Sequence, residues 1–148
     1  MSRSSYSDEW NGWDSIMWGW RVASAIRGKR GQKFLRELRD ALDAMPVKEL
    51  IAGELVDDGE CCAIGCLAQA RGIDVSGIDP EDAERVAATF DIAEPLAREV
   101  VYENDEFGEW TPKGRVDDPA RRWEYMRKWV ERRIKKSVQP GAAEEERG

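Results

Sequence analysis

The sequence contains no histidine among its 148 residues. Histidine is the usual general acid–base group near neutral pH and the common partner of a nucleophilic serine or cysteine, so its absence argues against most catalytic dyads and triads. Cysteine is also scarce, because only Cys61, Cys62 and Cys66 are present. An odd number of cysteines in one short segment is not a disulfide framework, and without histidine they make a poor zinc site. We therefore expect a protein that is not an enzyme, with no catalytic residues, no metal and no cofactor.

Long apolar runs are missing as well. No stretch of the sequence approaches the roughly 18–20 apolar residues that cross a membrane, and the first residues lack the apolar core of a signal peptide. The length suits one domain, and free thiols suit a reducing compartment. We expect a cytoplasmic protein with a disordered N-terminus over residues 1–9, a single helical domain over residues 10–138 and a disordered acidic tail over residues 139–148.

The first apolar segment has the spacing of a helix. Ile16, Trp20 and Ala23 recur at helical intervals, which predicts a helix over residues 15–27 with Trp20 in the core. Gly28 is a natural end for this helix, since glycine readily leaves helical geometry.

Further helices follow from the same periodicity and from capping residues. The segment around Asp58-Gly59 is ambiguous: it suits a β-hairpin, although we favour a short extended piece near residues 50–55 followed by a helix. The sequence as a whole predicts a mainly α fold, a compact bundle of five to six short helices, with a minor β-hairpin as the open alternative. The expected helices after the first span residues 32–45, 61–71, 79–89, 93–103 and 118–136, and residues 104–116 are expected to be a polar loop.

Charge is distributed unevenly along the chain, although the net charge is −7. Residues 1–48 carry a net charge of +3, residues 49–118 a net charge of −14 and residues 119–148 a net charge of +4. The basic helices could pair with the acidic middle of the same chain. Alternatively they could bind an anionic partner such as a nucleic acid, or the acidic block 49–118 could bind a basic protein.

The segment Gly28–Gln32 is a candidate binding site. Its glycines permit a close backbone approach, and the following helix begins with unpaired amides and a positive dipole end. Lys29, Arg30 and Lys33 add positive charge there, with Arg36 one turn further on. These are the ingredients of an anion site, although the segment is not the phosphate loop GxxxxGK[ST] and an ordinary helix–helix turn is the alternative. Pairs Arg36–Asp40 and Arg39–Asp43 would neutralise part of this face.

Four of the seven tryptophans fall within eleven residues. Indoles at this density cannot all face the core from one surface helix. With Trp20 assigned to the core, Trp10, Trp13 and Trp18 are either a flap over apolar surface or a patch that binds a partner, because tryptophan is enriched in interface hot spots. Base stacking is a third interpretation.

The cysteines allow one catalytic alternative. Cys62 and Cys66 lie four residues apart among small apolar residues, which is typical of buried cysteine. A cysteine-dependent enzyme without histidine would need Cys61 or Cys62 beside a carboxylate base such as Asp105. We favour the buried interpretation.

Several segments together resemble a group of small phage and prophage proteins, over residues 18–136. That group has no assigned activity, so the resemblance transfers no catalytic residue. The chain departs from the group in its long segment Phe107–Asp118 and its tryptophan-rich start. The resemblance is carried by Ser24–Gln32 (Ser-Ala-Ile-Arg-Gly-Lys-Arg-Gly-Gln), Leu50–Ala52, Cys62–Asp74, Tyr102–Glu106 and the closing Trp123–Val130 segment.

What the resemblance implies is a phage accessory protein in the cytoplasm of a bacterial host. Such proteins commonly bind a host macromolecule, and inhibition of a defence system, as by anti-CRISPR proteins, is one instance. We therefore expect a protein that binds a host protein or nucleoprotein complex, with direct nucleic-acid binding or a self-associating phage component as alternatives. The residues expected to make the contact are Lys29, Arg30, Lys33, Arg36, Trp10, Trp13 and Trp18.

Overall fold

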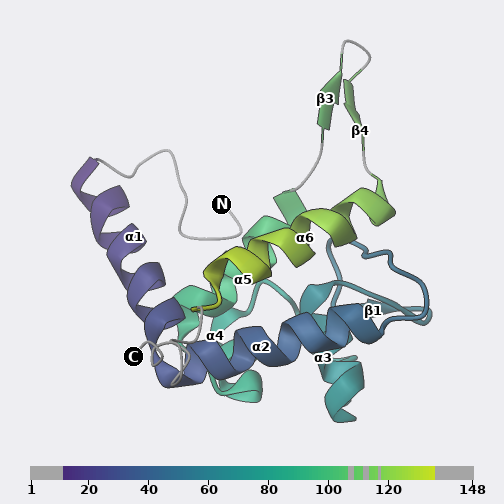
Figure 1. Ribbon diagram of the computed structural model, residues 1–148, viewed down its shortest axis with the longest axis horizontal. Helices are drawn as coiled ribbons and strands as arrows, with labels where there is room; N and C mark the ends of the chain where they lie inside the picture. Colours follow the sequence, from purple (N-terminus) through teal and green to yellow (C-terminus); the bar gives the residue numbers. More distant parts are fainter. Residues whose placement is uncertain (1–11, 107–108, 112–113, 117, 136–148) are drawn as a thin grey trace, which may run out of the picture.

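A computed structural model describes the backbone of residues 12–106, 109–111, 114–116 and 118–135, and the side chains of residues 16–106 and 118–135. Over this part of the chain the fold is mainly helical, as predicted, with six helices and two small antiparallel two-stranded sheets (Figure 1). Within the same ranges, no helix combines the length and the apolar character that a bilayer span requires.

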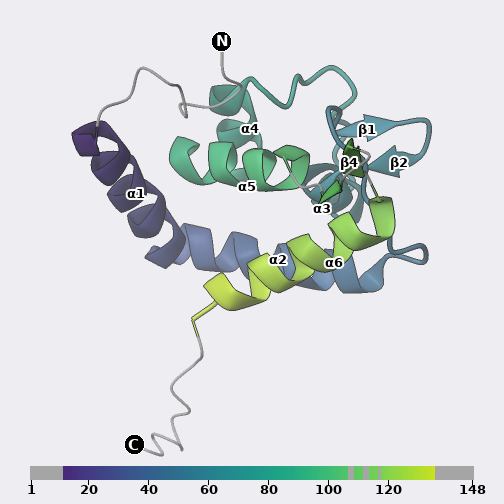
Figure 2. The ribbon, with the colours of Figure 1, turned by 90° about the horizontal axis from the view of Figure 1, so that it is seen from above.

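Helices α1 (Gly12–Arg27) and α2 (Lys29–Ala44) meet at a corner, the α1–α2 corner, formed by residues 24–33 (Figure 2). The predicted end of α1 at Gly28 is confirmed, since the chain leaves helical geometry there and restarts at once. A Cβ atom on Gly31 would lie 2.0 Å from the carbonyl oxygen of Ala25. Glycine is therefore required at this position because the two helix backbones approach so closely.

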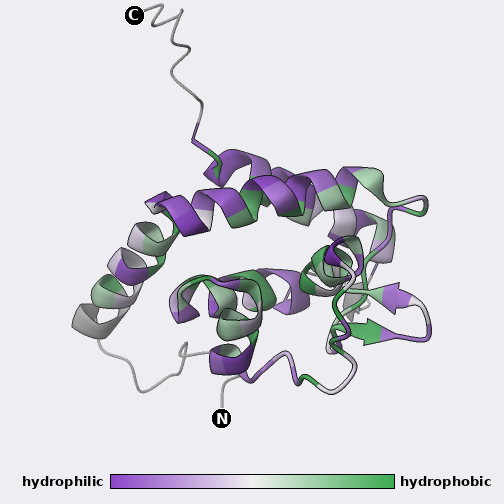
Figure 3. Ribbon diagram, turned by 90° about the horizontal axis from the view of Figure 1, so that it is seen from below, coloured by the Kyte–Doolittle hydropathy of each residue, from purple (hydrophilic) through white to green (hydrophobic). Residues whose placement is uncertain are grey.

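The core lies between α2 and the helices that cover it. Helix α6 (Pro119–Arg133) runs antiparallel along α2, and α3 (Ala63–Arg71) packs against α2 and α5 (Glu94–Glu106). The predicted apolar stripe of α2 is buried: Phe34, Leu35, Leu38 and Leu42 are each at most 1% exposed. Helix α4 (Ala83–Phe90) pairs with α5 on the far side. Figure 3 shows the outward side of α2 as mainly hydrophilic, whereas hydrophobic residues recur along α1.

The ambiguous segment before α3 contains both structures that the sequence allowed. Strand β1 (Val56–Asp57) pairs with β2 (Glu60–Cys61), and the turn residues Asp58 and Gly59 have φ angles of 52° and 84°. Two successive positive φ angles are typical of the type I′ turn that favours hairpins. Helix α3 then follows, as favoured from the sequence, and it is capped at its C-terminal end by Gly72 in the left-handed conformation.

Several predicted boundaries were wrong: α1 begins at Gly12 and α2 at Lys29, each three residues before the expected start, and two later boundaries change the structure more. Residues 104–116 are not a continuous loop, because α5 continues to Glu106 and strands β3 (Glu109–Thr111) and β4 (Gly114–Val116) form a second hairpin. The helix expected to begin after Asp79 begins at Ala83 instead, capped by the Asp82 carboxylate. Asp79 caps only a turn, since its Oδ1 accepts from the Glu81 amide at 2.9 Å. Two aspartates compete for the cap in this segment, and the second is followed by the apolar residues that reach the core.

Buried polar side chains join the helices at two places. Asn104 is 1% exposed and its Nδ2 donates to the Ile51 carbonyl at 2.9 Å, while its Oδ1 accepts from the Ala63 amide at 3.1 Å. Arg122 is 2% exposed, and its Nε donates to the Asn104 carbonyl at 2.7 Å. These bonds tie α5 and α6 to the segment before β1 and to the start of α3.

Candidate binding site

Helix α1 presents an apolar face to solvent. Trp20 is 69% exposed and Ile16 is 52% exposed. The prediction that Ile16, Trp20 and Ala23 share a face is consistent with helical geometry, but the prediction that Trp20 is in the core was wrong. The opposite side of α1 is turned inward instead, where Trp18 is 8% exposed. Helix α1 packs against both α5 and α2, and at the α2 end the Ala25 carbonyl lies close to Gly31.

The four clustered tryptophans therefore separate into different roles. Trp18 was expected to bind a partner, but it is buried against the rest of the molecule and offers little surface. Trp20 takes its place as the exposed indole. Trp10 lies outside the described residues, and Trp13 lies in α1 with its side chain outside them.

A groove runs beside the exposed indole, between α1 and the start of α5. It is open to solvent and has a volume of about 740 Å³. Met17 and Trp20 form part of the α1 wall, and Ala93 and Pro95 form the opposite wall. We call this feature the α1–α5 groove; its floor and both walls are largely apolar.

Among the side chains that the structure describes, the charged residues that line the α1–α5 groove are Arg21 and Arg27, and no carboxylate is with them. A smaller adjoining pocket shares Ala93 with the groove and is lined by Lys29 and Arg30. Arg30 bonds to Asp91 at 3.0 Å. Arg21, Arg27 and Lys29 have no ion pair within the part of the chain that the structure describes, so their charge is available to a partner.

The α1–α2 corner is first of all a structural joint. Gln32 is 4% exposed, and its Nε2 donates to the Ile26 carbonyl at 2.7 Å and to the Arg133 carbonyl at 3.1 Å. The side-chain oxygen of Gln32, Oε1, accepts from the Lys135 amide at 2.8 Å. Gln32 therefore supplies hydrogen-bond partners to carbonyl groups at the C-terminal ends of α1 and α6. With the close approach at Gly31, this explains the glutamine and that glycine of the predicted site without a ligand.

The basic side chains of the predicted site are nevertheless exposed. Lys29, Lys33 and Arg36 are spaced along one face of α2, and none of them forms an ion pair with another described residue. Arg30 is the exception because it pairs with Asp91. The structure thus leaves a basic stripe along α2, and of the predicted binding residues these three remain fully available.

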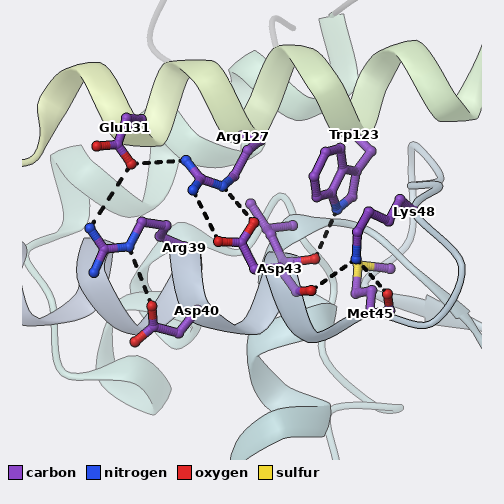
Figure 4. A network of polar contacts seen from close by, with 9 residues as sticks. Arg39, Asp40, Asp43, Met45, Lys48, Trp123, Arg127 and Glu131 are labelled. Carbon is purple, nitrogen blue, oxygen red and sulfur yellow. Dashed lines mark hydrogen bonds and ion pairs between the residues drawn. The ribbon is translucent and has the colours of Figure 1, made fainter.

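Other charges expected to pair along one helix instead pair between α2 and α6 (Figure 4). Asp43 accepts from Arg127 at 2.7 Å and 3.0 Å, so the expected Arg39–Asp43 pair does not form. Arg39 contacts Asp40 at 3.3 Å and Glu131 at 3.9 Å. The hydrogen bonds from Arg127 lower the pKa of Asp43. The two basic segments are therefore linked in part through their own acids, Asp43 and Glu131. Pairs with the acidic block 49–118 include Arg30–Asp91 and Arg121–Asp118.

The cysteine cluster is buried, as favoured from the sequence. Cys61, Cys62 and Cys66 are each at most 4% exposed and are free thiols. Burial raises the pKa of Cys62 to about 12, and its Sγ accepts from the Gly65 amide at 3.4 Å as the cap of α3. A hydrogen bond from Cys66 lowers the pKa of Cys61, and the same bond with burial raises the pKa of Cys66.

The proposed base, Asp105, lies near enough that its negative charge adds to the raised pKa of Cys62, which disfavours the reactive thiolate. Asp105 accepts from the Gly53 amide at 3.2 Å and from Asn104 Nδ2 at 2.9 Å, which are structural contacts. Among the described residues, no group of three or more cysteine, aspartate or glutamate side chains has the arrangement to hold a metal ion.

Sequence reasoning missed the exposed Trp20 and the second wall of the groove. Periodicity could place Trp20 with Ile16, but it carried no signal for which side of α1 meets the core. The sequence around Ala93 and Pro95 predicted only the start of another helix, because the position of these residues beside α1 depends on how α5 packs.

Comparison with known proteins adds no relative. No protein-family model matches the chain, and no curated protein or solved structure is significantly similar to it.

Proposed function

We propose that this protein is a binding module, not an enzyme, and that it engages another macromolecule through α1 and the α1–α2 corner. The observation that supports this most is the 69% exposure of Trp20. Exposing so large an apolar side chain to water is unfavourable, and tryptophan and arginine together are the residues most enriched in interface hot spots. Both occur here, with Arg21 and Arg27 beside Trp20 along one groove.

The sequence resemblance to small phage and prophage proteins supports a host context for this binding. We propose that the partner is a protein or nucleoprotein complex of the bacterial cytoplasm, and that a defence complex is a candidate of this kind. This step is an analogy with phage accessory proteins, and the experiment below does not depend on it.

A photo-crosslinking experiment tests the binding surface. A benzophenone amino acid is placed at Trp20 in the full-length protein, expressed in bacterial cells and irradiated. The matched control places it at Val47, which is 60% exposed but lies at the other end of α2. We expect a discrete adduct of higher mass from position 20 alone. Equal adducts from both positions, or none from position 20, would contradict the proposed surface.

Nucleic-acid binding is the second candidate function. Lys29, Lys33 and Arg36 are exposed along one face of α2, and a row of cations can follow a phosphate backbone. This candidate predicts binding of duplex or single strands that weakens steeply with salt and is lost when Lys29, Lys33 and Arg36 are changed to glutamine. Phosphate contacts are strong at a low salt concentration of about 50 mM, so the absence of a gel shift under that condition would rule out nucleic-acid binding.

A further inference from the structure

The chemistry of the α1–α5 groove indicates what kind of partner fits it, if the proposed function holds. The groove has a volume of about 740 Å³, and its lining includes Met17, Trp20, Ala23, Ala93 and Pro95. An open apolar groove of this kind accommodates the apolar face of a peptide helix, which places side chains at i, i+3 and i+4 against it.

The charge around the groove is one-sided. Arg21 and Arg27 line it and Lys29 lines the adjoining pocket, and among the side chains that the structure describes no carboxylate lines either of them. The nearest carboxylates on the α4–α5 side are already engaged: Asp91 with Arg30 at 3.0 Å, and Glu94 with Arg98 at 2.6 Å. A partner that brings its own carboxylates would therefore meet unneutralised cations along the α1 wall of the groove and at the start of α2.

The start of α2 adds to the same field. Gly28 and Gly31 also line the adjoining pocket, which places the first turn of this 16-residue helix beside it. The amide groups of a first helical turn have no intrahelical acceptor and carry the positive end of the helix dipole. The surface next to the groove is thus positive through its backbone as well as its side chains.

We propose that the α1–α5 groove binds an acidic amphipathic segment of a partner protein. A large apolar side chain of that segment packs against Trp20 between Ala93 and Pro95, and flanking carboxylates pair with Arg21 and Arg27. A nucleic acid fits this site poorly, because its phosphates would lie over Met17 and Trp20 without pairing. A basic segment is excluded by the arginines.

Peptide selection tests this proposal without a known partner. A displayed library of random 16-residue peptides is selected on the full-length protein, and the enriched peptides are synthesised with a fluorescent label. We expect enriched sequences that combine a large apolar anchor with aspartate or glutamate. By hot-spot precedent, Trp20→Ala should weaken their binding about tenfold or more, whereas Val47→Ala should leave it unchanged.

A charge-reversal experiment then distinguishes recognition of the acidic residues of the peptide from nonspecific hydrophobic binding. Arg21→Glu with Arg27→Glu should abolish binding of the acidic peptide and gain binding of a matched peptide in which lysine replaces each acidic residue. The control is Lys128→Glu, an exposed residue on α6 that should change neither affinity. Circular dichroism confirms that each variant remains folded.

Three outcomes would overturn the proposal. The first is enrichment of basic or uncharged peptides, and the second is equal enrichment on the Trp20→Ala variant. The third is a dimer, detected by sedimentation and dissolved by Trp20→Ala, which would make a second copy of the chain the occupant. If crosslinking at position 20 succeeds while the selected peptides are not acidic, the binding function stands and only the chemistry assigned to the partner fails.

Discussion

Glycine has opposite roles at one position in α1 and one in α2. At Gly31 a Cβ atom would lie 2.0 Å from the Ala25 carbonyl oxygen, whereas at Gly19 it would meet nothing within 4 Å. The first glycine permits helix contact, and the second only costs backbone entropy within α1.

We therefore expect Gly31→Ala to lower the free energy of unfolding by about 2–3 kcal/mol, because the helices must separate to admit the methyl group. Gly19→Ala, the matched control, should be neutral or stabilise by about 0.5–1 kcal/mol, since alanine favours helix. Urea unfolding followed by circular dichroism measures both. A Gly31→Ala variant as stable as Gly19→Ala would show that the close contact is absent.

The three thiols provide a second prediction for single residues. Burial raises the pKa of Cys62 to about 12, from an ordinary value of 9.0, so the reactive thiolate is scarce at neutral pH. We expect Cys62 to react with iodoacetamide at pH 7–9 at least about 100-fold more slowly in the folded protein than in urea, where the thiol is solvated. Mass spectrometry of the alkylated peptides gives the rate for each cysteine. Rapid labelling of Cys62 near pH 6 would instead support the cysteine-dependent enzyme.

At the scale of helices, the α2–α6 pair is held together by apolar and polar contacts along its length (Figure 4). Trp123 Nε1 donates to the Leu42 carbonyl at 3.1 Å, and Lys48 Nζ donates to the carbonyls of Asp43 and Met45 at 2.8 Å and 2.7 Å. These bonds satisfy carbonyl groups at the C-terminal end of α2. The same helices are linked through Asp43 and Arg127.

A double-mutant cycle on Asp43 and Arg127 tests that ion pair. The two side chains are 48% and 25% exposed, so solvent screening limits the coupling to about 0.5 kcal/mol. Because the pKa of Asp43 is lowered in the folded state, the coupling should be present above pH 3.8, its ordinary value, and be lost as the pH falls through the folded-state pKa.

The more exposed Arg30–Asp91 pair, at 59% and 80% exposure, serves as the control and should show no measurable coupling. An Asp43–Arg127 coupling that is unchanged once NMR shows the Asp43 carboxyl to be protonated would contradict the electrostatic origin given to it.

At the scale of the whole molecule, buried polar groups define how the helices are placed. Asn104 bonds to the Ile51 carbonyl and the Ala63 amide, and its own carbonyl accepts from Arg122. Asn104 of α5 thereby connects the segment around Ile51, the start of α3 and helix α6. These directional bonds fix the relative positions of the three segments more narrowly than apolar packing does.

Asn104→Ala should lower the free energy of unfolding by about 2–3 kcal/mol, because it leaves the Ala63 amide and the Ile51 carbonyl buried without partners. Gln69→Ala, an exposed position on α3, is the control and should change it by less than about 0.5 kcal/mol. Thermal and urea unfolding measure both variants. Equal stability of the two would remove the structural role assigned to Asn104.

Local chemistry in the sequence was enough to predict the six helices and some of their ends. The apolar stripe of Phe34, Leu35 and Leu38 predicts α2. Helix ends lie at the capping residues Gly28, Gly72 and Asp118. Capping and periodicity depend on neighbours a few residues away, so the sequence reveals both. The burial of the cysteines followed in the same way from their apolar surroundings.

The rotation of α1 and the choice of ion-pair partners could not be found this way. A helical period groups Ile16 with Trp20, yet this group faces solvent, while Trp18 on the opposite side of α1 is buried where α1 packs against α5 and α2. Likewise Asp43 pairs with Arg127 of α6, not with Arg39 one turn away. Both outcomes depend on contacts between segments far apart in the chain. The spacing of residues along the sequence therefore could not predict the exposed indole or the groove beside it.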